Sequence, residues 1–131
     1  MILILTPAAH AEMIAAARAA HPREACGLLL GRDGVVETAT AERNVHPEPE
    51  RHFEIDPLAL IAAHKAARTG GAQVAGYWHS HPNGRPGPSS TDRAHATGDG
   101  RVWAIVADGT VSVWIDAPEG FKALSYAVRS G

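Results

Sequence analysis

Cysteine is nearly absent from this sequence: Cys26 is the only one in 131 residues. A lone thiol cannot form an intramolecular disulfide, and it cannot provide the set of thiolates that closes most structural zinc sites. We expect Cys26 to be a small buried apolar side chain rather than a nucleophile. Neither disulfides nor cysteine-bound structural zinc can therefore hold this fold together.

Long apolar runs are missing as well. No stretch reaches the roughly 20 residues that a membrane-spanning helix needs, and residues 1–7 lack the basic start and the apolar length of a secretion signal. The formal net charge of −2 gives no overall attraction to nucleic acid. We therefore expect a cytoplasmic protein with neither a membrane nor a nucleic acid as its partner.

Several familiar catalytic motifs are also absent. The chain has no His-Glu-x-x-His helix, no Gly-rich phosphate loop, no nucleophile elbow and no zinc-deaminase pattern. What it does have is 45% hydrophobic residues in a length typical of one domain. We expect residues 1–131 to form a single domain with a buried core.

Apolar patterns and turn signals predict helices and strands in alternation. Helices are expected over 8–20, from Asp56-Pro57 to about Arg68, and from Ser89 or Ser90 to about Thr97. Strands are expected over 2–5, 25–30, 35–41, 74–78, 102–107, 111–115 and 121–128. Prolines and glycines make 82–88 a loop. This order predicts an α/β fold with a mixed, largely antiparallel sheet flanked by two helices and a short third one.

Two histidines stand two residues apart directly after the strand expected over 74–78. On an extended backbone the side chains of His79 and His81 point to the same side, whereas on a helix they diverge. Asp92 follows after the loop. Two imidazoles and one carboxylate form a three-ligand set that leaves a coordination position open, as catalytic zinc sites do. The spacing alone is equally consistent with a chance pair. The other histidines are expected to be ordinary surface or core residues: His10, His21, His46, His52, His64 and His95.

Ser89 and Asp92 have a second interpretation. Ser-x-x-Asp is typical of a helix capping box, in which the serine hydroxyl and the acidic side chain bond to backbone N–H groups at the start of a helix. We expect this role and metal ligation partly to exclude each other, because a carboxylate bound to zinc cannot easily fold back onto its own cap.

A zinc hydrolase also needs a carboxylate that moves protons. Glu24, at the entrance to the strand expected over 25–30, is one candidate, although an exposed strand-entrance carboxylate is the simpler interpretation of its local sequence. Other carboxylates compete for the role on chemistry alone: Glu37, Glu42, Glu54 and Asp56. Local sequence does not choose among them.

Taken together, these residues resemble the JAMM (MPN-plus) metalloprotease family. Its signature is a distant glutamate, then His-Ser/Thr-His-Pro and, after a fixed gap, Ser-x-x-Asp. This chain has Glu24, the run 79–82 reading His-Ser-His-Pro and the run 89–92 reading Ser-Ser-Thr-Asp. The segments 21–31 and 51–57 are also similar to small prokaryotic members, so the resemblance covers most of the chain.

The resemblance implies a role for each residue of the motif. His79, His81 and Asp92 would bind one Zn²⁺ ion, with water as the fourth ligand. Glu24 would deprotonate that water and pass the proton to the leaving amine, and Ser89 would donate a hydrogen bond to the tetrahedral oxyanion. The resemblance thereby selects Glu24 over the other carboxylates.

The resemblance also implies a fold and a substrate. The fold would be the MPN three-layer sandwich, a cytidine-deaminase-like arrangement in which a curved mixed sheet lies between helices. The substrate would be a ubiquitin-like or sulfur-carrier protein of the ThiS/MoaD type, cut at the peptide or isopeptide bond after its C-terminal Gly-Gly. We expect a monomer or a homodimer, without the insertions that recognise ubiquitin chains in eukaryotic members.

Two alternatives remain at this point. A RadC-type protein associated with DNA repair has a similar loop, and 82–89 resembles it, but Ser80 in place of asparagine, the segment 24–27 and the acidic balance argue against it. The other alternative is a non-catalytic MPN scaffold, a class that usually loses the metal ligands retained here. A salt-dependent affinity for DNA would favour the first.

Overall fold

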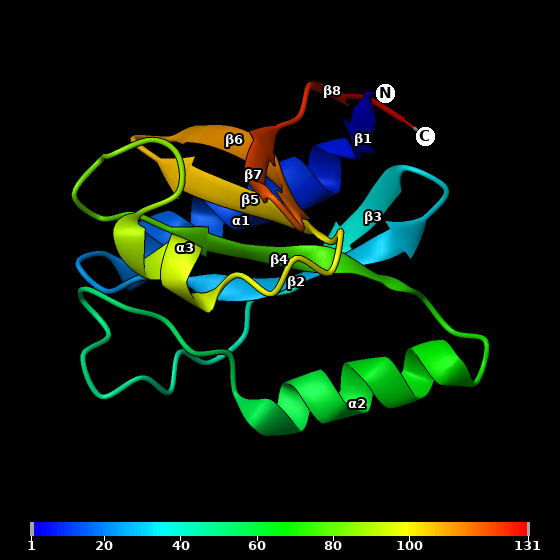
Figure 1. Ribbon diagram of the computed structural model, residues 1–131, viewed down its shortest axis with the longest axis horizontal. Coiled ribbons are helices and arrows are strands. Elements are labelled where there is room, and N and C mark those ends of the chain that lie inside the picture. The colour runs from blue at the N-terminus through cyan, green and yellow to red at the C-terminus, as the bar shows by residue number, and fades with distance from the viewer. Residues whose placement is uncertain (1, 131) are drawn as a thin grey trace.

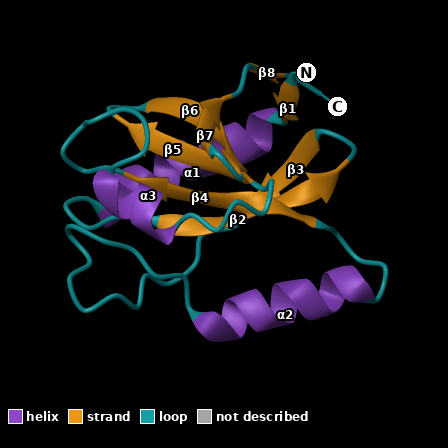
Figure 2. Ribbon diagram, viewed as in Figure 1, coloured by secondary structure: helices purple, strands orange, loops and turns teal. Residues whose placement is uncertain are grey.

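The computed structural model describes residues 2–130 of the chain. Its strands form one eight-stranded sheet in the order β7-β6-β5-β4-β2-β3-β1-β8, and Figure 2 shows this sheet between the helices α1 and α2. The elements in chain order are β1 (Leu3–Leu5), α1 (Pro7–Ala20), β2 (Cys26–Arg32), β3 (Val35–Ala39), α2 (Pro57–Arg68), β4 (Val74–Ser80), α3 (Ser90–His95), β5 (Val102–Ala107), β6 (Thr110–Ala117), β7 (Gly120–Ala123) and β8 (Tyr126–Val128). The central position of β4 matters most for function, because this strand carries the first histidine of the motif and ends just before the second.

The sheet is mixed, as the sequence predicts. β1 runs parallel to β3 and β8, and β4 runs parallel to β5. The remaining neighbours are antiparallel: β2 pairs with β3 on one side and β4 on the other, and β6 pairs in the same way with β5 and β7. Figure 1 shows the strong twist of the sheet. The expected α/β class is confirmed.

α1 covers one face of the sheet. The Thr6 side chain accepts the N–H of Ala9 and Pro7 occupies the first turn, so the helix starts where the sequence predicts. Figure 1 shows α1 behind the sheet, and the buried side chains of Ala9 and Met13 belong to the main hydrophobic core there. The strands contribute to this core with Leu5, Leu29, Val36, Trp78 and Val113, among others.

α2 covers the opposite face. Asp56 caps the helix by accepting the N–H of Leu58. The inner side of α2 packs on side chains that alternate along the strands with those under α1, namely Cys26, Leu28 and Tyr77. α1, the sheet and α2 thus form three layers, with α3 on the same side as α2. Within residues 2–130, every helix is too short or too polar to cross a membrane.

Several expected boundaries differ from the structure. The last strand, expected over 121–128, is split into β7, which pairs with β6 at one edge, and β8, which pairs with β1 at the other. Side-chain alternation indicates an extended backbone but not its partner, and these two halves have partners at opposite ends of the sheet. α3 ends at His95 rather than Thr97, because the backbone of Ala96 is extended (ψ 139°). β3 ends at Ala39, short of 41.

Candidate metal centre

β4 fixes the direction of the first histidine. His79 lies between Cys26 of β2 and Ile105 of β5 in the sheet register. Its imidazole is fully buried and stacks on the ring of Phe53, with centroids 4.3 Å apart and planes inclined by 17°. The ring of Trp103 meets it edge-on at 5.8 Å. The side chain of His79 therefore has little freedom to turn.

His81 lies just beyond the end of β4, two residues on and directed to the same site. Its backbone N–H donates to the carbonyl oxygen of Val106 at 2.8 Å, and its Nδ1 lies 2.8 Å from the carbonyl oxygen of Arg85. Since a carbonyl can only accept, Nδ1 carries a proton, and in the neutral ring Nε2 keeps its lone pair for a metal. The loop 82–88 thus fixes the tautomer of His81 as well as leading the chain to α3.

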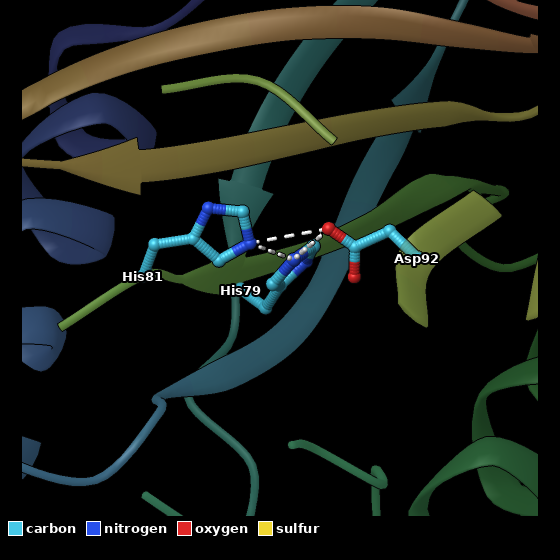
Figure 3. Close-up of side chains that lie close together, drawn as sticks. All are labelled: His79, His81 and Asp92. Atoms are coloured by element: carbon cyan, nitrogen blue, oxygen red, sulfur yellow. Dashed lines mark hydrogen bonds and ion pairs between the residues drawn. The ribbon is translucent and has the colours of Figure 1, made fainter. Parts of the chain in front are cut away.

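Asp92 reaches the two imidazoles from α3 (Figure 3). Its Oδ2 lies 3.1 Å from Nε2 of His79 and 3.1 Å from Nε2 of His81, and the two Nε2 atoms are 3.1 Å apart. The same Oδ2 accepts the N–H of Ser89 at 2.9 Å, while Ser89 Oγ accepts the N–H of Asp92 at 3.0 Å. The expectation that the capping box would partly exclude the ligand geometry is therefore wrong. A carboxylate oxygen has more than one lone pair and can serve both purposes.

The three converging atoms fit a zinc ion. Tetrahedral zinc with bonds of about 2.0–2.1 Å places neighbouring ligand atoms about 3.3 Å apart, close to the observed triangle of 3.1 Å sides. Within residues 2–130, this is the one group of three His, Cys, Asp or Glu side chains with converging ligand atoms. Nδ1 of His79 is buried without a hydrogen-bond partner. All polar contacts of the His79 ring are therefore made by Nε2, which faces the site.

The electrostatics of Asp92 and His79 agree with metal binding, whereas a metal would have to displace a proton from His81. Burial alone would raise the pKa of Asp92, but hydrogen bonds with His79 and His81 lower it far below its usual range. Burial lowers the pKa of His79 and favours its neutral form. Burial also acts to lower the pKa of His81, but the hydrogen bonds with Asp92 and Arg85 raise it overall. An ionised carboxylate and neutral imidazoles are the forms that bind a metal.

Glu24 lies beside these three groups and is not the exposed carboxylate that its local sequence suggests. The residue is 7% exposed, and burial raises the pKa of its carboxyl group to about 7. It shares a cavity of about 10 Å³ with Ser89 and Asp92, close to the smallest volume that holds one water molecule. A carboxyl group that titrates near neutrality can accept and return a proton at physiological pH.

Ser89 can act in this cavity despite its role as a helix cap. Its Oγ already accepts the N–H of Asp92, but a hydroxyl group accepts and donates at the same time. The hydroxyl hydrogen remains available as a donor toward the space between Ser89 and Glu24.

The other residues weighed from the sequence are placed as follows. Cys26 is 1% exposed, and burial raises the pKa of its thiol to about 12, so it is the inert buried side chain that the sequence predicts. His52 and His95 line the walls of the small cavity, which their sequence context does not indicate. The competing carboxylates all lie outside that cavity: Glu37, Glu42, Glu54 and Asp56.

Two further residues hold the site together. Ser80 Oγ accepts the N–H of Ala25 at 2.8 Å and so ties the residue after Glu24 to the histidine motif. Asn44 Nδ2 donates to the carbonyl oxygens of Glu24 and His52, both at 3.0 Å. Ser80 lies inside the His-Ser-His-Pro motif, so the sequence already draws attention to it. Asn44 stands in a loop with partners far along the chain, and no local pattern identifies it.

Comparisons with known sequences point to one family. The family of prokaryotic homologues of the JAB domain matches residues 6–117. The desampylase of Haloferax volcanii is 37% identical over 112 residues, which cover 82% of this chain and 80% of that protein. A probable TtuB-protein conjugate cleaving protease of Thermus thermophilus is 42% identical over 71 residues, which cover 54% of this chain and 47% of that protein.

Solved structures agree with this assignment. A protein from Desulfitobacterium hafniense aligns with a TM-score of 0.86 at 30% identity, over 99% of this chain and 94% of that one. A JAB1/MPN domain protein from Archaeoglobus fulgidus aligns with a TM-score of 0.61 at 20% identity, over 95% and 96% of the two chains, and supports the fold. The three layers are thus the MPN sandwich. The chain belongs to the prokaryotic JAB family and is a zinc-dependent hydrolase of the JAMM type.

Proposed function

We propose that this protein is an isopeptidase or peptidase that releases a ubiquitin-like or sulfur-carrier protein of the ThiS/MoaD type by cutting after its C-terminal Gly-Gly. The observation that carries this proposal is the convergence of His79, His81 and Asp92 beside the buried carboxyl group of Glu24. The relatives named for desampylation and for the cleavage of protein conjugates support the choice of substrate.

The three converging side chains would hold one zinc ion. The donors are Nε2 of His79, Nε2 of His81 and Oδ2 of Asp92, and the fourth position is left to water. When bound, zinc supplies a Lewis acid for the substrate carbonyl and lowers the pKa of a water molecule to about 7. The contact of His81 Nδ1 with the carbonyl oxygen of Arg85 keeps the other nitrogen aimed at the site.

Glu24 holds the proton that moves during the reaction. When ionised, its buried carboxylate accepts a proton from the attacking water. The same carboxyl group then returns the proton to the nitrogen of the leaving amine. The small volume of the cavity keeps this exchange away from bulk solvent.

Ser89 stabilises the charge that develops on the substrate. As water adds to the carbonyl carbon, the carbonyl oxygen gains negative charge. The Ser89 hydroxyl group can donate a hydrogen bond to it while still accepting the N–H of Asp92. Glu24 and Ser89 thus act on different atoms of the same amide group: Glu24 on the nitrogen, Ser89 on the oxygen.

The narrowness of the site favours a Gly-Gly tail. Arg51, Phe53 and Trp103 wall the cavity of about 10 Å³, which has room for about one water molecule. A substrate backbone must therefore pass close along its rim, where glycine brings no side chain. A wider apolar groove of about 260 Å³ adjoins it at Phe53 and Trp103, against α2. This groove offers room for the residues that precede the two glycines.

Cleavage of defined carrier fusions by the zinc-loaded protein tests this function. The substrates are a carrier of the ThiS/MoaD type joined through its Gly-Gly end to a peptide or a lysine side chain, and a matched fusion with Ala-Ala at that end. Mass spectrometry should show a carrier ending in Gly-Gly, released from the first substrate only. Absence of cleavage, cleavage at another bond, or cleavage that persists in a His79→Ala variant would refute the proposal.

A further inference from the structure

β6 presents a buried carboxylate that the proposed reaction does not use. Asp116 is 1% exposed. Its Oδ2 accepts the backbone N–H of Thr97 and its Oδ1 accepts the backbone N–H of Gly98, each at 3.0 Å. A carboxylate is costly to bury, so its presence under this loop calls for an explanation.

Thr97 and Gly98 closely follow α3, the helix that carries Asp92. α3 has six residues, too few for a helix to be stable by itself. Its last hydrogen bond runs from the N–H of Ala96 to the carbonyl oxygen of Asp92 at 3.0 Å. The next residue, Thr97, is the one that Asp116 holds. The buried carboxylate is therefore one residue away from the bond that closes α3 onto the backbone of Asp92.

The chain before α3 rests on the same face of β6. Trp114 lies two residues before Asp116, so both side chains point to the side of the sheet that faces α3. A Cβ atom added to Gly87, in the loop before α3, would meet the Trp114 ring at 3.2 Å. β6 thus supports both flanks of the helix, by packing at Trp114 and by directional hydrogen bonds at Asp116.

We propose that Asp116 is a positioning residue for the metal centre. By holding the two residues that follow Ala96, it keeps the Asp92 carboxylate at the imidazoles of His79 and His81. The inference rests on the proposed metal site and assigns to it a supporting residue on a different strand. A residue that only stabilised the fold would change unfolding, whereas a positioning residue changes the metal affinity of the folded protein.

The first test compares two Asp→Asn variants of the full chain. Asp116→Asn keeps the side-chain size but places an amide N–H₂, which cannot accept, opposite one of the two backbone N–H groups. Zinc affinity is measured by competition with a chromophoric chelator, at a temperature where circular dichroism shows each variant folded. We expect zinc binding to weaken by about 10–100-fold. The visible bands of the Co²⁺-substituted protein should also lose their tetrahedral intensity.

The matched control lies in the same loop. The Asp99 carboxylate accepts the backbone N–H of Arg101 at 2.9 Å, pairs with its guanidinium at 3.1 Å and interacts with the Thr97 side chain. Asp99→Asn therefore makes the same chemical change in the same loop and leaves both backbone N–H groups after Ala96 bound to Asp116. Its zinc affinity should equal that of the wild type.

A second pair of variants removes the hydrogen bond from the loop side, in case Asp116→Asn does not fold. Thr97→Pro deletes the N–H that Asp116 accepts, and the extended backbone of Ala96 (φ −63°, ψ 139°) suits a residue before proline. Thr97→Ala retains that N–H. We expect weaker zinc binding in the proline variant only.

The outcomes separate this inference from the proposed function. If Asp116→Asn or Thr97→Pro lowers the thermal midpoint but binds zinc as tightly as the wild type, Asp116 is a structural residue and the inference is overturned. If the wild type binds no zinc, or His79→Ala binds it equally well, the metal site itself fails, and the proposed function with it.

Discussion

The two sides of the metal centre are built in different ways. β4 is a central strand with neighbours on both sides, and its His79 is fully buried against Phe53. α3 is a six-residue helix whose Asp92 carboxylate also serves in its own capping box. β4 and the residue just after it supply two donors in fixed directions, whereas the third donor depends on a few hydrogen bonds. Small changes near α3 should therefore disturb the site more than small changes along β4.

Glu24→Gln should have the largest effect on turnover, because Glu24 belongs to neither side and moves the proton. We expect kcat to fall by roughly 10²–10⁴, with zinc affinity unchanged, since the three donors remain. Turnover of a carrier fusion and zinc content are measured on the same preparation. An unchanged rate would remove Glu24 from the mechanism.

Ser89→Ala should lower both turnover and stability, because one hydroxyl group serves the cavity and the cap of α3. We expect a loss of roughly 10²–10³ in kcat and about 1 kcal/mol in the free energy of unfolding. Thr6→Ala is the matched control, because Thr6 caps α1 away from the site. It should lose about 1 kcal/mol and keep its full kcat. A Ser89→Ala variant that behaves like Thr6→Ala would leave Ser89 as a cap only.

The pH dependence of kcat/KM should reflect the ionisation of the Glu24 carboxyl group. Burial raises the pKa of this carboxyl group to about 7, and the group must be ionised to accept a proton. Bound zinc lowers this pKa below its metal-free value, and we expect kcat/KM to fall about tenfold for each pH unit below the resulting pKa. The residual activity of Glu24→Gln should lose this acid limb. A wild-type profile that stays flat from pH 8 to pH 5 would assign the proton transfer to another group.

The same carboxyl group should also cost stability in the metal-free protein. Its pKa is raised from 4.5, the ordinary value of an exposed glutamate, to about 7 in the folded protein, so the folded state binds the proton more tightly. Stability is therefore lost as pH rises from about 4.5 through 7. Glu24→Gln should gain on the order of 3 kcal/mol over the wild type at pH 8 and little at pH 4. Urea unfolding at both pH values measures this, with the exposed Glu37→Gln as the unchanged control.

Removal of the metal should have the smallest effect on the overall fold. The main core under α1 contains none of the three donors, so chelation should leave far-UV circular dichroism unchanged while activity is lost. Hydrogen exchange should then rise at the N–H groups of Asp92 in α3 and of Ala96 just after it, and stay slow at His79 in β4. Global unfolding on chelation would instead indicate a structural site.

The sequence predicted the strand side of the site better than the helix side. A period of two places His79 and His81 on one side of an extended backbone, and the prolines and glycines of 82–88 predict the turn that follows. The shared use of Asp92 Oδ2 by the cap and the donor triangle was not predicted, because it depends on the angle at which α3 meets β4. Glu24 was selected over the other carboxylates by the resemblance to the JAMM family and not by its spacing in the sequence.

Contacts between distant parts of the chain account for the other features that the sequence did not predict. Asn44 is recognised as a support for Glu24 only when the loop 44–52 is folded beside it. The separation of β7 from β8 likewise depends on which edges of the sheet are free. Neither feature has a local pattern in the sequence, because both arise from partners that the chain meets only after folding.

Zinc titration of the chelator-stripped protein, with cleavage of a Gly-Gly carrier fusion followed in the same samples, tests the central claim most directly. We predict that activity rises in proportion to added zinc up to one equivalent per chain, and that His79→Ala shows neither binding nor cleavage. Cleavage by the zinc-free protein, or tight zinc binding that survives in His79→Ala, would contradict the claim.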